Sequence, residues 1–433
     1  MGAASSELKA ALCGCLILLI PFAYAGLALM SSGMGRSRSA VHSLVAALAA
    51  AAVAAVVYVA FGFAWQGTPA VPSYGLATGG VVWNWIASGR FFFDGLDPSG
   101  TPTTLLTACF GVFACAFTAV IPLGAGEERW RLGAMLASTA MLAGWTFPLF
   151  AHWVWGGGWL SALGWQSGIG RGFLDAGGAG VIQVVGGFSA LSITWLLGAR
   201  RGKFSQEGMP AAIPGHNSVF VTFGCFLALV GWFGLNSSAA ILFYGAEPGR
   251  IPLIAVNTLL TAAGAMLAAA LLTRTRFGKP DASLSANGWT AGLAASSAGA
   301  AFQVPTEALI VGLVAGVLVT FSVEWLELHF KIDDPAGSIS VHAAGGLWGL
   351  LAAGFLGHFP IAGGDGQMMA QLIGVATLLG FVLPLLYASN WMLNKLIPYR
   401  APLDGERQGM DLHELGANAY PELVSHFDDI PQR

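Results

Sequence analysis

Polar residues recur with one spacing inside two apolar stretches of the chain. Asp175 is followed eight positions later by Gln183, and Asp334 is followed eight positions later by His342. An aspartate at a helix N-terminus accepts hydrogen bonds from free N–H groups, and eight residues of helix rise about 12 Å. In a bilayer core about 30 Å thick, Gln183 and His342 would lie near the midplane. The amide could then hydrogen-bond there, and the imidazole could exchange a proton.

Polar groups at that depth are costly unless they line a path or satisfy each other. A single buried histidine is more often a satisfied core group, but the matched position of Gln183 favours a pore lined by both residues. His152, His216 and His358 stand alone in the sequence, without a nucleophile or a metal set beside them. We therefore predict neither an enzyme nor a cofactor or metal site.

Composition predicts the surroundings of these residues. Of the 433 residues, 55% are apolar and 9% are charged, whereas soluble domains carry about 25% charged residues. The 60 glycines lie within apolar runs, as in closely packed membrane helices. The net charge of −3 gives no reason to expect nucleic acid as a partner. The five cysteines lie in apolar stretches and are interpreted as buried thiols. The chain is predicted to be a polytopic protein of the lipid bilayer.

A membrane-crossing helix needs about 20 mostly apolar residues. Eleven segments meet this length, at about 10–32, 41–64, 104–124, 133–153, 179–198, 217–241, 252–273, 286–303, 308–328, 339–357 and 367–393. We predict a transmembrane domain over 1–393, with halves at about 10–198 and 217–357 and a last helix at about 367–393. Residues 394–433 form a cytoplasmic tail. The long loop at 65–103 is expected to pack over the outer mouth.

Positive charge predicts the orientation, because Lys and Arg gather on the cytoplasmic side. With the N-terminus outside, fifteen of the 19 Lys and Arg residues lie inside, and Lys9, Arg90, Arg171 and Arg250 lie outside. The N-terminus is therefore predicted outside and the C-terminus in the cytoplasm.

The two halves of the chain echo each other. Besides the two aspartate spacings, the run from Gly26 to Ser32 is similar to the run from Gly234 to Ser238. Each half has five helices, and an odd number of crossings inserts the second copy upside down. The predicted fold class is all-α integral membrane, with a five-plus-five inverted repeat and a final helix.

Several motifs then carry a family resemblance. They are Gly-Trp-Phe-Gly-Leu-Asn at 231–236, His-Trp-Val-Trp-Gly-Gly-Gly at 152–158, Gly-Ala-Gly-Glu-Glu-Arg at 124–129, Asp-Asp-Pro at 333–335 leading to His342, and the tail from Glu406 to Tyr420. Together they resemble the ammonium transporter (Amt/Rh) family over nearly the whole chain. The resemblance implies an Amt-type homotrimer in the cell membrane, with one pore per subunit.

The resemblance also implies roles for single residues. Trp155 matches an outer vestibule tryptophan that attracts ammonium, and Ser297 a hydroxyl nearby. Phe110 lies in the segment of an aromatic gate, with Phe113 next to it. Trp232 belongs to the pore wall. Asp175 matches a structural aspartate, repeated as Asp334, and His342 matches the second of two pore histidines.

The mechanism that follows is physically sound. A desolvated cation gains up to about 2 kcal/mol over an aromatic face, but a bare charge in an apolar pore is prohibitively costly. Ammonium can leave its proton behind and potassium has none to lose, so deprotonation acts as a selectivity filter.

Three positions depart from the family pattern. Gln183 stands in place of the first pore histidine, Leu235 in place of the second gate phenylalanine, and Ala239 in place of a serine at the outer cation site. Glutamine can orient His342 but cannot take up a proton. We expect weaker recruitment and no proton relay through two imidazoles.

The sequence favours a channel or transporter for ammonium or methylammonium. Two alternatives remain open. The first is a sensor-like member that binds ammonium but conducts little, which is disfavoured because no kinase or cyclase domain follows the last helix. The second is a pore retuned to another small neutral solute. The tail is predicted to regulate transport through a PII-type protein, although Leu415-Gly416-Ala417 departs from the family's His-Gly-Glu. A merely solvated tail is the alternative.

Overall fold

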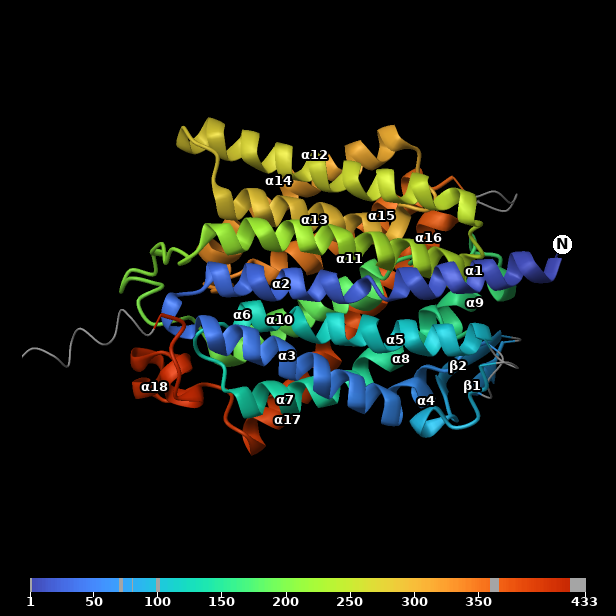
Figure 1. Cartoon of the computed structure of the whole chain (residues 1–433), viewed down its shortest axis with the longest axis horizontal. Helices are drawn as coiled ribbons and strands as arrows, with labels where there is room; N and C mark the ends of the chain where they lie inside the picture. Colours follow the sequence, from blue (N-terminus) through green and yellow to red (C-terminus); the bar gives the residue numbers. More distant parts are fainter. Residues whose placement is uncertain (1, 70–72, 80, 99–101, 359–365, 421–433) are drawn as a thin grey trace, which may run out of the picture.

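Long apolar helices run nearly side by side in the computed structural model, which describes residues 2–69, 73–79, 81–98, 102–358 and 366–420 (Figure 1). Within these residues, 10 helical stretches are long and apolar enough to cross a membrane. They are Glu7–Met34, Ser37–Gln66, Pro102–Gly126, Leu132–Ser167, Ala179–Leu197, Ser218–Tyr244, Pro248–Phe277, Pro305–Phe330, Ile339–Leu356 and Gln367–Leu396.

Short segments of 3-10 or π-helix, labelled η, divide these stretches into separate elements. The elements are α1 (Gly2–Ile17), α2 (Ile20–Met34), η1 (Ser37–Ser39), α3 (Ala40–Val57), η2 (Tyr58–Gly62), α4 (Phe63–Gln66), β1 (Ser73–Thr78), β2 (Val81–Ala87), η3 (Phe91–Phe93), α5 (Pro102–Val120), α6 (Leu123–Gly126), α7 (Leu132–Met141), η4 (Leu142–Thr146), α8 (Phe147–Val154), α9 (Trp159–Ser167), η5 (Ala179–Val184), α10 (Val185–Leu197), α11 (Ser218–Tyr244), η6 (Pro248–Arg250), α12 (Ile251–Phe277), α13 (Ala282–Gly299), α14 (Pro305–Phe330), η7 (Ile339–Ala344), α15 (Gly345–Leu356), α16 (Gln367–Thr377), η8 (Leu378–Val382), α17 (Leu383–Leu396), α18 (Leu403–Gln408) and η9 (Asp411–Leu415).

The eighth predicted span, 286–303, falls on α13 and is not one of these ten stretches. This helix carries polar residues such as Asn287 and Thr290, and its side chains from Ser285 onward are almost all buried. It lies among α11, α12 and α14 (Figure 1). A helix enclosed by protein needs no lipid-facing apolar surface. The number of eleven crossings therefore stays a prediction.

Glycines bring helices of the two halves together. A Cβ on Gly26 of α2 would lie 2.4 Å from the carbonyl oxygen of Gly224 in α11, and a Cβ on Gly224 would lie 2.5 Å from that of Gly26. A Cβ on Gly187 would meet the backbone of Ala343, and one on Gly346 would meet that of Ala179. This reciprocal packing of related helices is the pattern expected of an inverted repeat.

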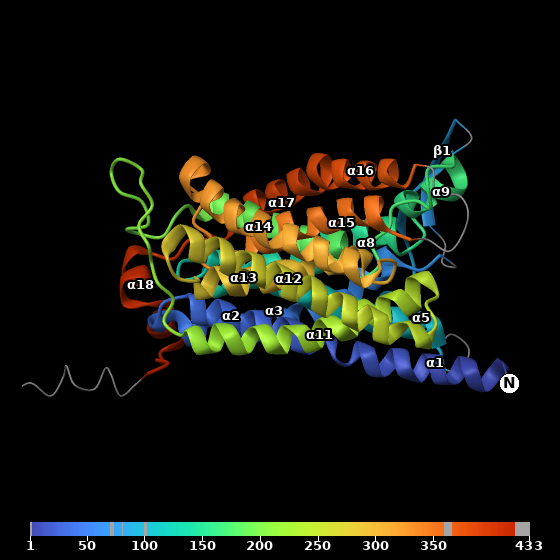
Figure 2. The same ribbon diagram turned by 90° about the horizontal axis from the view of Figure 1, so that it is seen from above.

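The last span joins the two halves. In Figures 1 and 2, α11 to α15 lie on one side of the bundle, and α16 and α17 return along α15 toward α10 and α7. The Gln371 amide of α16 donates to the carbonyl oxygens of Leu174 and Leu350 at 2.9 and 3.0 Å. Ser138 of α7 donates to Asn390 of α17 at 2.6 Å.

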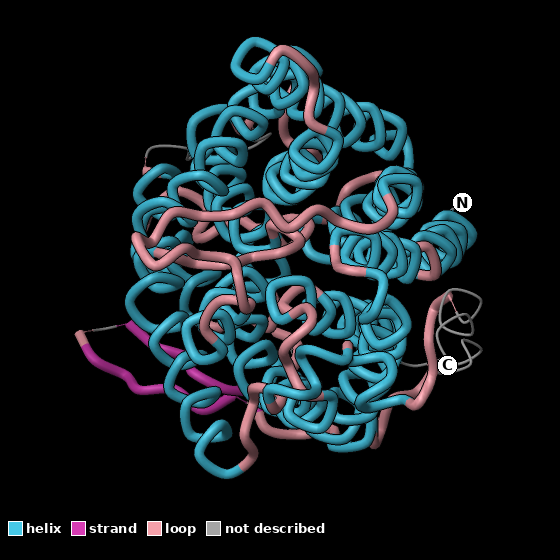
Figure 3. The backbone as a smooth tube through the Cα atoms, turned by 90° about the vertical axis from the view of Figure 1, so that its left-hand side faces the viewer, coloured by secondary structure: helices cyan, strands magenta, loops and turns pink. Residues whose placement is uncertain are grey.

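The two ends of the bundle differ. One end, the hairpin end, holds the N-terminus, the antiparallel strands β1 and β2, and α9; the other, the tail end, holds α18 and η9 (Figures 1 and 3). The hairpin was not predicted, and the expectation that the 65–103 loop packs over the outer mouth stays a prediction. Its Trp83 and Trp85 pack against Trp159 of α9 and Trp153 of α8.

Candidate functional site

A cavity of about 500 Å³ opens at the hairpin end. We call it the hairpin-end cavity; its lining residues are Thr68, Pro69, Thr103, Thr104, Thr107, Val154, Trp155, Gly157, Ser161, Arg171, Phe173, Leu174, Leu242, Phe243 and Tyr244. Residues from both ends of the 65–103 loop, Thr68, Pro69 and Thr103, border it. Among these lining residues, Arg171 alone carries a formal charge. The cavity is therefore aromatic and hydroxyl-rich, with one positive group that opposes cation entry.

Trp155 and Phe243 line this cavity, and Phe110 packs behind them; we call the three rings the aromatic floor. Trp155 stacks on Phe243 with ring centroids 4.7 Å apart and planes 2° apart. Phe110 meets both rings edge-on at 5.5 and 5.4 Å. The Trp155 indole donates to the carbonyl oxygen of Asp175 at 2.9 Å, which holds its ring in place. One face of Trp155 is covered, so a cation can use only the other face or the edge of the stack.

Sequence reasoning missed Phe243 and its neighbour Tyr244. Phe243 follows Asn236 of the Gly-Trp-Phe-Gly-Leu-Asn motif by seven residues, or about two helical turns, so both lie on one face of α11. That spacing was the available signal. Tyr244 also accepts a hydrogen bond from the Asp175 backbone at 2.9 Å.

A second aromatic contact lies deeper along α5 and α11. Phe117 meets Trp232 edge-on at 4.8 Å, and both side chains are fully buried. Phe117 follows Phe110 by seven residues on the same helix face, whereas Phe113 is half-buried and does not line the hairpin-end cavity. Sequence reasoning named Phe113 and missed Phe117.

Ser297 and Ala239, predicted for the vestibule, and Leu235, predicted for the pore, are not among the residues that line the hairpin-end cavity. The Ser297 hydroxyl accepts a hydrogen bond from the Trp232 indole at 3.0 Å. Leu235 and Ala239 are fully buried in α11. Trp155, Phe243 and the threonines form much of the cavity wall, and the vestibule roles of Ser297 and Ala239 stay predictions.

Gln183 and His342 are in contact at the centre of the molecule. The Nδ1 atom of His342 lies 2.7 Å from the Oε1 atom of Gln183, and both side chains are buried. An amide oxygen only accepts, so in this amide orientation Nδ1 carries the proton and Nε2 keeps its lone pair. The pair therefore places two polar side chains, held in a fixed orientation by their hydrogen bond, in otherwise apolar surroundings.

The helices that carry this pair begin at aspartates. Asp175 accepts from the backbone N–H groups of Gly180 and Val181, both at 2.8 Å. Asp334 accepts from the N–H groups of Ser338 and Ile339 at 3.0 and 2.6 Å. Gln183 lies in η5 and His342 in η7, and both segments are wide π-type turns. Such turns are common at functional sites, and no feature of the sequence predicted them.

A small pocket lies on the other side of the pair. This tail-side pocket has a volume of about 20 Å³ and is bordered by His342 together with residues of α2, α5 and α13. The Gln183–His342 pair thus stands between the hairpin-end cavity and the tail-side pocket, as a group that controls passage would have to.

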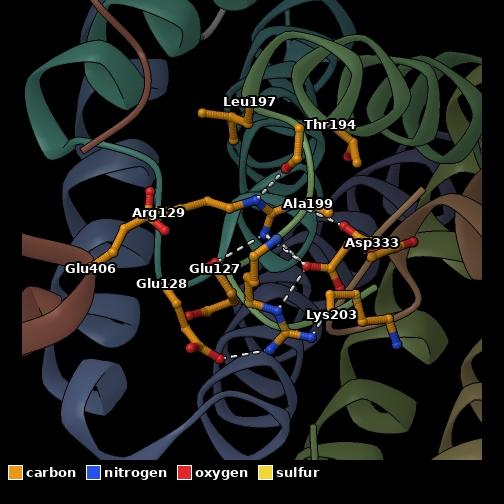
Figure 4. A network of polar contacts seen from close by, with 12 residues as sticks. Glu127, Glu128, Arg129, Thr194, Leu197, Ala199, Lys203, Asp333 and Glu406 are labelled. Carbon is orange, nitrogen blue, oxygen red and sulfur yellow. Dashed lines mark hydrogen bonds and ion pairs between the residues drawn. The ribbon is translucent and has the colours of Figure 1, made fainter. Parts of the chain in front are cut away.

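A buried ionic network closes the tail end (Figure 4). Arg200 donates to Glu128 at 2.7 Å and to Asp333 at 2.9 and 3.0 Å, and Arg36 also pairs with Glu128. Arg129 donates to the carbonyl oxygens of Asp333 and Gly198, both at 2.8 Å. The network ties the end of α10 to the residue before the Asp334 cap. Sequence reasoning noted the Glu127-Glu128-Arg129 motif without giving it this role.

Burial changes the acidity of this network. Burial raises the pKa of Glu127 to about 8, although the Ser43 hydroxyl donates to its carboxylate. Burial alone would also raise the pKa of Asp333, but the hydrogen bond from Arg200 and the nearby charges of Arg129 and Arg200 outweigh it and lower that pKa. Asp333 is therefore held as a carboxylate, and the pKa of Glu127 lies close to neutral pH.

The described part of the tail is folded against the tail end. Asp411 accepts from the backbone N–H groups of His42 and Val41 at 2.6 and 3.2 Å. Glu414 accepts from the Leu132 N–H at 2.8 Å and contacts His42 Nε2 at 2.9 Å. Residues up to 415 are thus docked on α3 and α7, which argues against a merely solvated tail.

Comparisons with known proteins agree with this architecture. The family model described as Ammonium Transporter Family matches residues 11–420. Ammonium transporter Amt2 of Archaeoglobus fulgidus is 33% identical over 98% of this chain and 89% of its own length. The ammonium transporter of Bacillus subtilis is 29% identical over 94% of this chain and 97% of its own length.

Solved structures show the same fold. A structure titled Sensor Amt Protein aligns with a TM-score of 0.86 over 96% of this chain and 100% of its own, at 24% identity. Candida albicans Mep2 aligns with a TM-score of 0.78 over 98% of this chain and 91% of its own, at 25% identity. The family match spans nearly the whole chain, and the chain therefore belongs to the ammonium transporter family as a multi-pass membrane channel or transporter for ammonium, not an enzyme.

Proposed function

We propose that ammonium enters at the hairpin-end cavity, gives up its proton to water above the aromatic floor, and crosses beside Gln183 and His342 as ammonia, while the proton crosses by its own path through His342. One observation carries this proposal: a single imidazole, held at 2.7 Å by an amide, stands between two cavities in a buried apolar region. In this scheme Trp155, Phe110 and Phe243 form the entry site, and Trp232 and Leu235 belong to the wall beyond it. Asp175 and Asp334 set the depth of the polar pair.

The energetics favour deprotonation before passage. A bare ammonium ion in an apolar path would pay the full cost of an unpaired buried charge, whereas neutral ammonia does not. Potassium cannot reduce its charge, so it is rejected at the same place. Gln183 cannot carry a proton, so His342 is the sole imidazole of the pair and any proton path must use it without a histidine partner.

Transport measurements in liposomes test this function. The purified protein is reconstituted, and pulses of ammonium, methylammonium and potassium are applied on a supported-membrane electrode, with protein-free liposomes as the control. We expect currents for ammonium and methylammonium and none for potassium. Ammonium binding without current would favour the sensor-like alternative. No response to either ammonium or methylammonium would favour a pore retuned to another small neutral solute.

We propose further that the hairpin end faces outward and the tail end faces the cytoplasm of a cell membrane. The clustering of Arg36, Arg129, Arg200 and Arg400 at the tail end supports this orientation. An epitope placed after Arg433 should resist protease in intact cells and be cleaved after lysis. Cleavage in intact cells would reverse the orientation.

We also propose assembly as a homotrimer. Large apolar side chains are exposed along α11 and α12, among them Phe223, Phe226, Leu267 and Leu271. A membrane protein can cover such side chains with lipid or with neighbouring subunits, so the measurement is the subunit number in native mass spectrometry. Three subunits are expected, and a monomer under conditions that preserve activity would contradict the proposal.

The tail, residues 394–433, is proposed as a regulatory segment that a PII-type protein contacts. The docking of its described part on α3 and α7 through Asp411 and Glu414 supports this proposal. Deleting residues 404–433 should alter transport or PII association and leave the assembly intact. Unchanged transport and unchanged PII capture would remove this role.

A further inference from the structure

A buried histidine that the transport scheme does not use lies next to the hairpin-end cavity. His152 belongs to the last turn of α8, and its side chain is 1% exposed. It contacts Gln66 at the end of α4, which packs against α8 at the hairpin end (Figure 1). Tyr58 of η2 completes what we call the Tyr58–Gln66–His152 cluster. None of the three residues is among those that line the cavity.

Two hydrogen bonds hold this cluster together. The Nδ1 atom of His152 lies 2.7 Å from the backbone carbonyl oxygen of Gln66, and the Tyr58 hydroxyl donates to the Oε1 atom of Gln66 at 2.7 Å. Because a carbonyl oxygen only accepts, Nδ1 carries the proton and Nε2 keeps its lone pair. Gln66 is therefore held from two sides, through its backbone by His152 and through its side chain by Tyr58.

The cluster keeps two polar atoms without partners. The Nε2 atoms of His152 and Gln66 are buried, and neither has a hydrogen-bond partner among the described residues. Each such atom costs free energy comparable to a lost hydrogen bond. Packing alone would favour apolar side chains here, which indicates that the position of Gln66 matters for function.

Gln66 leads directly into the wall of the hairpin-end cavity. Gly67 follows it with a φ of +61°, and Thr68 and Pro69 then line the cavity. A positive φ suits glycine, so the chain turns sharply after Gln66. A shift of the Gln66 backbone would therefore move Thr68 and Pro69 relative to the rest of the wall.

His152 also fixes the turn that carries Trp155. Its carbonyl oxygen accepts from the N–H groups of Gly156 and Gly158 at 3.1 and 2.9 Å. A Cβ on Gly156 would collide with the Gln66 carbonyl oxygen and would lie 2.7 Å from the Nδ1 atom of His152. The turn is thus pressed against the bond between the two residues, and His152 joins the aromatic floor to the wall that follows Gln66.

Tyr58 connects the cluster to the third ring of the aromatic floor. A Cβ on Gly111 of α5 would collide with the Tyr58 hydroxyl, so this hydroxyl lies against the α5 backbone next to Phe110. Phe110 in turn meets Trp155 and Phe243 edge-on. The cluster therefore contacts the segments that carry two of the three floor rings and one wall of the cavity.

We propose that the Tyr58–Gln66–His152 cluster is a positioning element of the entry site, which holds the Thr68–Pro69 wall and the aromatic floor at a fixed separation without touching the solute. This inference rests on the proposed entry of ammonium at the hairpin-end cavity. A site whose wall adopts several positions binds with an affinity reduced by the fraction of molecules in the competent arrangement. His152 is thus a positioning residue for recruitment and takes no part in passage at the central pair.

Currents from liposomes, measured against ammonium concentration, separate recruitment from passage. In His152→Ala the bond to Gln66 is lost, and we expect the half-saturation concentration to rise about fivefold, as for one hydrogen bond of ordinary strength, while the maximal current stays within about twofold. His152→Asn should restore the half-saturation of the parent, because its amide N–H can replace the Nδ1 donor. Tyr58→Phe loses only a hydroxyl and should raise the half-saturation about twofold.

His216→Ala is the matched control. The Nδ1 atom of His216 also contacts a backbone carbonyl oxygen, that of Gly35 at 3.1 Å, but this contact lies at the tail end beside the ionic network. Its half-saturation should therefore equal that of the parent.

The inference is overturned if folded His152→Ala keeps the half-saturation of the parent or loses maximal current alone, or if His152→Asn is as impaired as His152→Ala. Melting temperatures show which variants fold. Should His152→Ala fail to fold, an unchanged half-saturation in Tyr58→Phe is contrary in its place. A parent that conducts while its variants match it defeats this inference alone, whereas a parent without an ammonium current defeats the proposed function on which the inference rests.

Discussion

The hairpin-end cavity and the tail-side pocket sit on opposite sides of Gln183 and His342, and they are built differently. The first has a volume of about 500 Å³, an aromatic floor and Arg171 in its wall. The second has about 20 Å³, and its lining combines apolar side chains with three hydroxyl groups, the Asn287 amide and His342. A large aromatic vestibule can concentrate a cation only weakly, because each ring face contributes about 0.5–1 kcal/mol when exposed. Discrimination must therefore come from deprotonation at the inner end of this vestibule and from the narrow apolar path that follows, not from the affinity of the vestibule for the cation.

This difference follows from substitutions in an otherwise repeated architecture. Pseudo-symmetric helices place Leu27 and Leu235, and Ser31 and Ala239, at corresponding positions. The repeat places the same helix positions on both sides of the central pair, and single side chains at these positions then make the two sides differ in polarity. Four substitutions test how far the two sides differ, from the largest expected effect to the smallest.

Removing the imidazole should have the largest effect. In His342→Ala, the one titratable group of the central pair is lost, so we expect the ammonium current to fall by about tenfold or more, or its selectivity over potassium to disappear. Currents from liposomes with ammonium and potassium pulses measure both quantities. His358→Ala is the control, since that histidine is exposed and pairs with Glu307 at 2.7 Å, far from the pair. An unchanged current and unchanged selectivity in His342→Ala would make the pair structural packing only.

Restoring a second imidazole should act in the opposite direction. Gln183→His would place two titratable rings in contact at the centre, and we expect the ammonium current to rise several-fold, about the range that one added proton-transfer group supplies. Gln183→Asn is the control, because it keeps an amide but shortens its reach to His342. If Gln183→His conducts no better than the parent, proton transfer at the pair does not limit the rate.

Regular helix geometry explains what sequence alone could predict. Apolar length marks the spans, because a bilayer of fixed thickness demands it. The regular rise of a helix relates Asp175 to Gln183 and Asp334 to His342, since each intervening residue adds the same depth. The resemblance to a family then gave the order of elements and the substrate class.

Features that depend on contacts between distant segments could not be predicted in this way. The stack of Trp155 on Phe243 joins two helices whose relative rotation no local pattern encodes. The ionic network links Glu128, Arg200 and Asp333 from three separate loops. Polar residues lower the mean hydropathy of α13 as a membrane span. These residues are tolerated there because they are buried against neighbouring helices.

Neutralising the charge in the hairpin-end cavity should have a moderate effect. Arg171→Gln removes the positive group from the cavity wall, and we expect the ammonium half-saturation concentration for transport to fall about two- to fivefold at low ionic strength. The difference should shrink at about 1 M salt, because a charge bordering water is screened there. Arg250→Gln is the control, since Arg250 does not line the cavity. Equal shifts in both variants would assign the effect to overall charge.

The smallest effect concerns stability at the tail end rather than transport. Burial raises the pKa of Glu127 to about 8, whereas an unfolded glutamate titrates near 4.3. Between these values the folded protein holds a proton that the unfolded chain releases. This contribution to stability is therefore complete below about pH 4.3 and is lost as pH rises through about 8.

Glu127→Gln removes this titration, so the variant should lose less stability than the parent between pH 5 and pH 8. The melting temperature of the purified protein at the two pH values measures this, and we expect the two pH-induced changes to differ by roughly 3 °C. Glu207→Gln, which alters an exposed carboxylate, should behave as the parent does. The outcome also sharpens the contrast between the two ends, because a carboxylate pKa near neutral pH arises only where the carboxylate is buried away from water. If Glu127→Gln and the parent lose stability equally, Glu127 remains ionised throughout this range, and the network at the tail end carries one more buried negative charge than its geometry suggests.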